Sequence, residues 1–140
     1  MFGLFVSGVT AFPLETELRF ICTFIPADTE LANWLQNVLF GISETNVKYP
    51  YMAYGTDWLA FAHLVIAVVF IGPFMDPVKN IWVIQFGIIA CLGIFPLAFI
   101  AGGIRDIPFF HQLIDCSFGV IGGFIMYFVY RKTKILENNA

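Results

Sequence analysis

Three ionisable side chains lie within strongly apolar stretches of the sequence, and their types and spacing are compatible with chemistry. His111 and Asp115 are four residues apart, so a helix places them on one face. His63 lies in a separate apolar stretch. Two imidazoles and a carboxylate form a ligand set for a divalent metal ion with one position open to water. His63 and His111 on adjacent helices could instead serve as the two axial ligands of a haem group.

Two other interpretations of these residues remain open. A chain of His and Asp side chains can pass protons across apolar surroundings. The same side chains can also act only as hydrogen-bonding contacts between helices, and we favour this structural role because the sequence has just two histidines and no HxxxH or CxxC pattern. The motifs GxxxxGK[ST], GxGxxG, GxSxG and HExxH are absent from the sequence, so no catalytic activity is indicated.

The composition indicates that these side chains are positioned by helices in lipid. Of the 140 residues, 59% are hydrophobic and 12% are charged, whereas roughly a quarter of an ordinary soluble domain is charged. The net charge of -3, with seven Lys and Arg residues, excludes a nucleic-acid-binding function. The three cysteines are too few and too scattered for a disulfide framework, and we expect free thiols at Cys22, Cys91 and Cys116.

Three long apolar stretches predict an all-α polytopic membrane protein. They are Trp58–Met75, Ile81–Gly103 and Ile107–Tyr130. Each has at least 18 residues, the length that a membrane-spanning helix needs, and in lipid such a run must satisfy its backbone amides internally. The short connections between them require antiparallel neighbours, which predicts a three-helix transmembrane bundle over residues 56–131. Pro96 predicts a bend in the second helix near Leu92–Pro96.

The amino-terminal third is expected to contain shorter helices. Residues 1–13 are apolar but too short to cross about 30 Å of hydrocarbon, so they form either an interfacial wedge or a short fourth helix, and a longer native chain upstream of Met1 stays open. Residues 14–55 predict an amphipathic cap outside the membrane. Its first helix should end at Pro26, its second should have Asp28 as N-cap, and residues 44–55 should form a loop.

The few basic residues predict the orientation in the membrane. Lys79, Arg131, Lys132 and Lys134 lie on one side of the predicted bundle, whereas Arg105 and Lys48 lie on the other. The positive-inside rule therefore places the tail, residues 132–140, in the cytoplasm and the cap, residues 14–55, outside it. In this arrangement His63, His111 and Asp115 share the outer third of the bundle and can meet in a polar pocket.

Small residues predict where the helices pack. Gly119 and Gly123 form a GxxxG pattern in the third span, and Gly87 and Ala67 belong to similar small-residue faces of the other two. A bundle of three long helices leaves much apolar surface for neighbours. We therefore expect the lipid bilayer and either further copies of the chain or a larger membrane complex as partners.

The sequence alone favours an accessory or assembly subunit of a membrane complex, acting through helix packing and its outer cap. The alternative is a membrane-embedded metal, haem or proton-relay site at His63, His111 and Asp115, with a catalytic or redox role.

Overall fold

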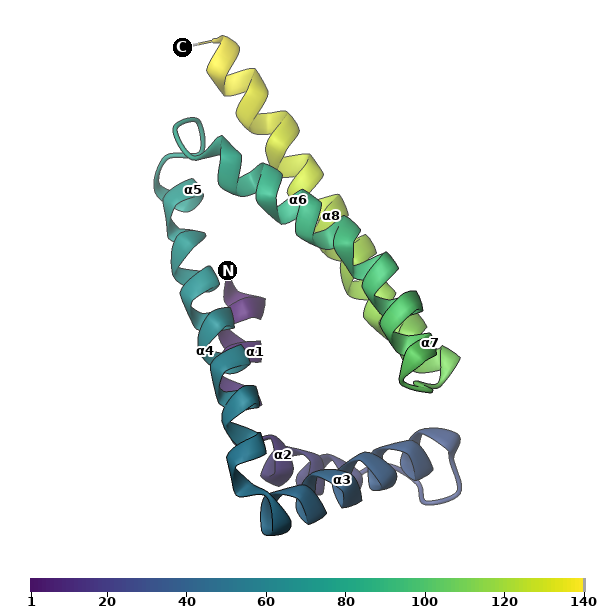
Figure 1. The fold of residues 1–140 in the computed structure, drawn as a ribbon. Helices are drawn as coiled ribbons and strands as arrows, with labels where there is room; N and C mark the ends of the chain where they lie inside the picture. The colour runs from purple at the N-terminus through teal and green to yellow at the C-terminus, as the bar shows by residue number, and fades with distance from the viewer. Residues whose placement is uncertain (140) are drawn as a thin grey trace. The chain divides into compact units, whose positions relative to one another are not determined.

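The structure is a computed structural model that describes residues 1–139, and every regular element within them is helical (Figure 1). Three helical stretches are long and apolar enough to cross a membrane, namely Pro50–Met75, Ile81–Ile104 and Phe109–Asn138. The predicted all-helical fold and the three candidate spans are therefore confirmed. In chain order the elements are α1 (Phe2–Ala11), α2 (Leu14–Cys22), α3 (Glu30–Lys48), η1 (Pro50–Met52), α4 (Ala53–Val69), α5 (Ile71–Met75), α6 (Ile81–Pro96), the π-helix η2 (Leu97–Ala101), α7 (Gly102–Ile104) and α8 (Phe109–Asn138).

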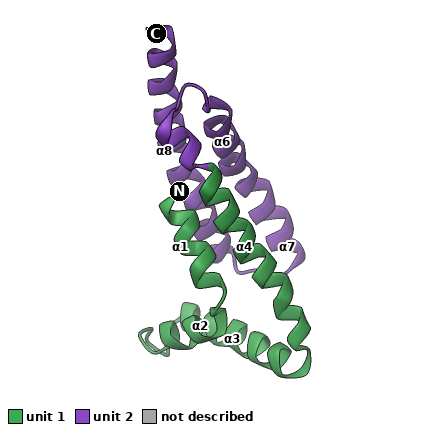
Figure 2. Cartoon of the chain, turned by 90° about the vertical axis from the view of Figure 1, so that its left-hand side faces the viewer, with its two compact units in different colours: residues 1–69 green, residues 70–140 purple. Residues whose placement is uncertain are grey.

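The chain forms two compact units, residues 1–69 and 70–140 (Figure 2). Unit 1 contains α1 to α4, and unit 2 contains α5 to α8. The predicted three-helix bundle over residues 56–131 draws its first helix from unit 1 and the other two from unit 2. That bundle therefore stays a prediction.

In unit 1 the apolar amino-terminal segment packs lengthwise and antiparallel on α4 (Figures 1 and 2). Gly8 makes this approach possible. A Cβ on Gly8 would lie 2.8 Å from Leu64 Cδ2 and 2.9 Å from the carbonyl oxygen of Ala60, so any larger residue would push the two helices apart. Whether α1 is a short fourth helix in the membrane or an interfacial wedge stays a prediction.

The cap of unit 1 differs from the prediction at its helix ends. The first helix, α2, ends at Cys22 and not at Pro26. The N-cap of α3 is Thr29 and not Asp28, and Thr29 Oγ1 accepts a hydrogen bond from the backbone N–H of Ala32 at 3.1 Å. Both residue types are good N-caps, so the choice depends on where the chain leaves the preceding turn.

The predicted loop over residues 44–55 is also wrong, because most of it is helical. α3 continues to Lys48, and η1 begins directly after Tyr49. Tyr49 alone interrupts the helices, with φ -139° and ψ 62°, because the ring of Pro50 disfavours the helical conformation in the residue before it. Pro50 then begins η1, where its missing N–H does no harm.

In unit 2, α6 and α8 form an antiparallel pair. Gly119 on α8 faces the carbonyl oxygen of Cys91 on α6, and a Cβ there would lie 2.9 Å from that oxygen. The π-helix η2 follows Pro96 directly, whereas the bend predicted near Leu92–Pro96 stays a prediction. Proline cannot donate the hydrogen bond that an α-helix needs at this position, and a wider helical turn accommodates the loss.

A tight turn joins α7 to α8. Asp106 has φ 53°, in the left-handed region, and the backbone N–H of Ile107 donates to the carbonyl oxygen of Gly102 at 2.9 Å. This pattern is a Schellman motif, whose left-handed position usually holds glycine. Gln112 supports the turn: its Nε2 donates to the carbonyl oxygen of Ile107 at 2.8 Å, and its side chain packs where a Cβ on Gly102 would lie.

The left-handed backbone at Asp106 gives a first prediction. Asp106→Gly should raise the free energy of unfolding by about 0.5–1 kcal/mol, because glycine adopts this conformation without the steric penalty of a Cβ. Asp106→Ala should lower it, since alanine keeps the Cβ and adopts the left-handed conformation less readily than aspartate does. Unfolding of both variants in mixed micelles is the measurement, and equal stability of the two would contradict the prediction.

Four of the five basic residues of unit 2 lie at one end of its helix pair, namely Lys79, Arg131, Lys132 and Lys134, whereas Arg105 lies at the other end, in the α7–α8 turn. The start of α6, next to Lys79, and the carboxyl-terminal part of α8 lie at the same end, and the α7–α8 turn lies at the other (Figure 1). The predicted tail over residues 132–140 is helical as far as Asn138, and Ala140 lies outside the described residues. The side of the membrane on which each end lies stays a prediction.

Candidate functional site

The predicted site residues belong to both compact units. In unit 1, His63 Nδ1 on α4 lies 3.2 Å from Ser7 Oγ on α1, within hydrogen-bonding distance. In unit 2, His111 Nε2 lies 3.9 Å from Asp115 Oδ1 on the same face of α8. The described residues contain no group of three His, Cys, Asp or Glu side chains that could hold a metal ion. The meeting of His63 with His111 and Asp115 stays a prediction.

Asp115 lies beside the irregular part of the facing helix. Together with Phe118 it lines a recess of about 250 Å³, whose other walls are Ile94, Leu97 and Ala98. The first residues of the π-helix η2, Leu97 and Ala98, therefore line the same recess as Asp115. Departures from the regular α-helical hydrogen-bonding pattern are frequent at functional sites. A titratable His–Asp pair next to such a turn is the arrangement that a proton or a small polar ligand could use.

The four residues predicted to pack helices lie at different distances from their neighbours. A Cβ on Gly119 would meet a backbone oxygen at 2.9 Å, whereas a Cβ on Gly123 would lie 3.6 Å from Cys91 Cβ, which is an ordinary contact. A Cβ on Gly87 would lie 2.9 Å from Met126 Cε. Ala67 is buried on α4.

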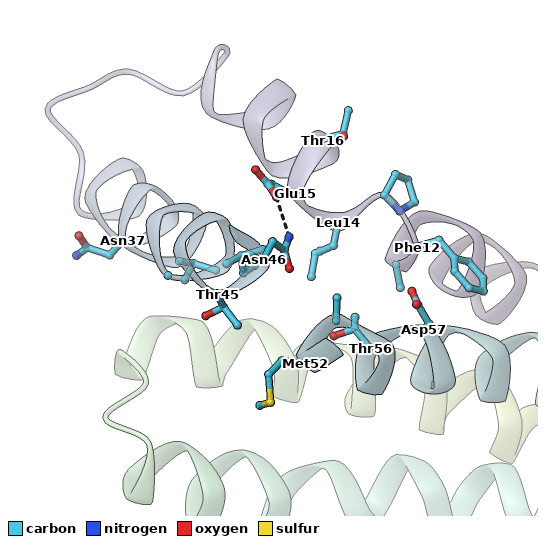
Figure 3. A pocket seen from close by; sticks show the side chains of 16 residues that line it. Phe12, Leu14, Glu15, Thr16, Asn37, Thr45, Asn46, Met52, Thr56 and Asp57 are labelled. Carbon is cyan, nitrogen blue, oxygen red and sulfur yellow. Dashed lines mark hydrogen bonds between the residues drawn. The ribbon is translucent and has the colours of Figure 1, made fainter. Parts of the chain in front are cut away.

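A network of hydrogen bonds joins the two cap helices. Glu15 Oε1 on α2 accepts from Arg19 Nη2 at 2.7 Å and from Ser43 Oγ on α3 at 2.8 Å. Its other oxygen, Oε2, accepts from Asn46 Nδ2 at 2.7 Å (Figure 3). Arg19 Nη2 also donates to Ser43 Oγ at 2.9 Å, so the guanidinium group bridges both helices. One carboxylate therefore orders the whole pair.

These donors stabilise the ionised form of Glu15. The hydrogen bonds from Arg19, then from Asn46 and Ser43, lower the pKa of its carboxyl group from 4.5 to about 2. The carboxylate is ionised throughout the physiological range, and hydrogen bonds from three side chains hold it in place. Its role is to hold the cap together.

The Glu15 network lies at the edge of a cavity of about 580 Å³ in unit 1 (Figure 3). The cavity lies between the α1–α2 corner, α3 and the first turns of α4. Its walls combine apolar side chains with polar ones, among them Leu14, Val38, Ile42, Met52, Thr45, Thr56 and Asp57. Unlike Glu15, Asp57 has no hydrogen bond or ion pair with any residue that the structure describes. It is the carboxylate in the cavity wall that no described side chain already engages.

Comparison with known proteins finds no matching family model, no similar curated protein and no similar solved structure. The assignment of the candidate site therefore rests on the geometry of this chain alone.

The sequence interpretation missed the Glu15 network and the partner of His63. Glu15 and Arg19 are an i,i+4 pair, and Ser43 and Asn46 are an i,i+3 pair, so each half was visible as the polar face of an amphipathic helix. Which faces pair depends on the tertiary structure. Ser7 lies next to Gly8 in an otherwise apolar stretch, and this was the available signal for a helix contact there.

The lowered pKa of Glu15 gives a second prediction. A carboxylate whose pKa is depressed on folding stabilises the folded state above its unfolded pKa of about 4.5, and this contribution is lost as the pH falls through about 2. We expect the packing of α2 on α3 to weaken between these values. The fluorescence of Trp34 on α3, measured with Trp58 and Trp82 replaced by Phe, reports the change.

Two variants make this prediction specific. Glu15→Gln should abolish the transition between pH 4.5 and 2, because its side chain does not titrate. Glu17→Gln, on the same helix but outside the network, should keep it. An unchanged acid transition in Glu15→Gln would show that another group is responsible.

Proposed function

We propose that the protein is a small integral membrane subunit that helps to assemble or stabilise a larger membrane complex. Its spans would pack on helices of the partner, and the α2–α3 cap would lie at the membrane surface. The observation that carries the proposal is how little of each span the chain itself covers. In the most apolar windows of the three candidate spans, 11%, 22% and 11% of the residues are buried.

The exposed side chains on these spans support helix packing with neighbours. Phe118, Phe124 and Phe128 on α8 are 65%, 74% and 56% exposed, and they lie on a helix whose small residues already pack on α6. In lipid, helix association depends on close packing and not on the hydrophobic effect. Large exposed aromatic side chains provide broad surfaces for such packing.

Site-directed photo-cross-linking tests the proposal. A photoreactive amino acid in place of Phe124 should cross-link, in the native membrane, to one defined protein or to a second copy of the chain. The same amino acid in place of Ile84, which is 1% exposed, serves as the control and should give no intermolecular product. If Phe124 and similarly exposed positions gave only lipid adducts, and the chain purified as a monomer in mild detergent, the proposal would be wrong.

A second candidate function rests on the His111–Asp115 pair beside η2. In this alternative, the two residues, with or without His63, form a proton-relay, metal or haem site. Metal analysis and an optical spectrum of the purified protein test the metal site and the haem site. A metal site predicts a stoichiometric metal ion, and a haem site predicts a Soret band. Either signal should be lost in both His63→Ala and His111→Ala. A proton relay predicts that Asp115→Asn abolishes pH-dependent behaviour that persists in Asp57→Asn. Partner cross-linking that survives all of these substitutions would separate the two functions.

A further inference from the structure

Four aromatic side chains line a recess that Asp57, which has no partner among the described residues, also borders. Tyr54, Asp57, Trp58 and Phe61 recur at intervals of one helical turn on α4, and so share a face. Phe12, at the end of α1, completes the set from across the helix pair, and the five residues line a recess of about 310 Å³. Asp57 borders both this recess and the larger cavity, and its side chain reaches from α4 toward the α1–α2 corner near Phe12 (Figure 3).

The rings are arranged edge to face. The ring centroids of Tyr54 and Trp58 are 6.0 Å apart with an interplanar angle of 84°, and those of Trp58 and Phe61 are 6.0 Å apart with an angle of 87°. Neighbouring rings in this geometry present faces in different directions, as the walls of a cage do. The faces of aromatic rings carry partial negative charge and attract cations, most strongly for Trp.

We propose that this recess, which we call the aromatic recess, binds the quaternary ammonium head of a membrane lipid. The recess favours a cation, because Asp57 is the one carboxylate that lines it and no described cationic side chain is paired with it. The aromatic walls select a quaternary ammonium over a primary one. A primary ammonium must replace three hydrogen bonds to water, whereas a trimethylammonium group has no N–H donors and needs only the carboxylate and the ring faces.

The position of the recess favours a lipid as the source of this group. The recess lies in the first turns of the candidate span Pro50–Met75, where Tyr49 and Tyr51 also gather. Trp and Tyr are enriched where a spanning helix meets the lipid headgroups. The recess is large enough for such a head, since about 310 Å³ corresponds to roughly ten water molecules at ~30 Å³ each.

The test uses the full chain in maltoside detergent with dihexanoylphosphatidylcholine below its micelle concentration as the probe. Saturation-transfer NMR should show the strongest transfer at the N-methyl protons of the probe. A titration should give weaker binding of the matched lipid in which a neutral 3,3-dimethylbutyl group replaces choline. Equal binding of the two lipids would overturn the proposal, because they differ only in the positive charge.

Substitutions test whether the probe binds at the aromatic recess and not to exposed aromatic side chains in general. Asp57→Asn should weaken binding of the probe about fivefold or more, and Trp58→Leu about two- to fivefold. The controls are Glu44→Gln, an exposed carboxylate on α3, and Trp82→Leu, whose indole is 59% exposed in unit 2. Both controls should bind the probe as the unaltered chain does. If Asp57→Asn kept both its circular dichroism spectrum and its affinity for the probe, the proposal that the probe binds at Asp57 would be wrong.

Two further probes identify the source of the ammonium group. Free choline should compete only weakly, since it lacks the acyl chains that hold a lipid at the interface. Phosphatidylethanolamine of the same chain length should bind more weakly than phosphatidylcholine, and equal or tighter binding would overturn the choice of a quaternary head. These binding measurements do not involve a protein partner, so they test the lipid site independently of the proposed assembly function.

Discussion

Gly119→Val should separate α6 from α8 and lower the free energy of unfolding by about 1–3 kcal/mol, the range for overpacking a close contact. The reason is the backbone oxygen of Cys91, which would lie 2.9 Å from the new Cβ. A carbonyl oxygen cannot move aside as a flexible side chain can. The helices must therefore shift, and the contacts of their whole interface weaken.

Two controls in the same helix pair make this prediction specific. Gly93→Val introduces the same side chain on α6, where a Cβ meets nothing within 4 Å, and should change stability by no more than about 0.5 kcal/mol. Gly123→Ala should also be tolerated, because its Cβ would make an ordinary contact of 3.6 Å. The measurement is pulse proteolysis in mixed micelles. Equal losses in Gly119→Val and Gly93→Val would show that the close contact does not set the stability.

Gly8→Leu should release α1 from α4 in unit 1. The new Cβ would lie within 2.9 Å of both Leu64 and the carbonyl oxygen of Ala60, and Ala60 is fully buried, so no space is available on either side. We expect a loss of about 1–3 kcal/mol in the local free energy of opening, which corresponds to amide exchange at least about fivefold faster throughout α1. The Ser7–His63 contact should be lost at the same time.

Hydrogen exchange measured by mass spectrometry tests this prediction peptide by peptide. Gly3→Leu, on the same helix but with nothing within 4 Å of its Cβ, is the matched control and should leave exchange in α1 unchanged. Exchange in α8 should be the same in both variants. Faster exchange of α1 in Gly3→Leu alone would show that the helix is held by a different face.

The composition and the apolar pattern were sufficient to predict the three candidate spans. Each of them contains a predominantly apolar run long enough for a helix to cross a bilayer, and no tertiary contact has to be known for that comparison. A local disturbance of the helix near Pro96 was predictable as well, since the missing N–H is a local property of the residue. Its form, a π-helix over Leu97–Ala101, was not.

The helix ends in the cap were predicted less well. Asp28 and Thr29 are both suitable N-caps, and only the path of the preceding chain decides that Thr29 Oγ1 accepts the hydrogen bond of Ala32. Residues 44–55 carry polar and aromatic side chains typical of a loop. The structure nevertheless continues the helix to Lys48, because the only local obstacle is the conformation that Pro50 imposes on Tyr49.

The sequence by itself determined that this chain is helical and where its three apolar spans lie, because both follow from the identity of consecutive residues. The tertiary structure decided which side chains from distant segments meet: Gly8 with Ala60, Ser7 with His63, Glu15 with Ser43 and Asn46, and Phe12 with the aromatic face of α4. Pairings of this kind depend on which helix faces oppose each other and in what register. Nothing in the spacing along the chain specifies either one.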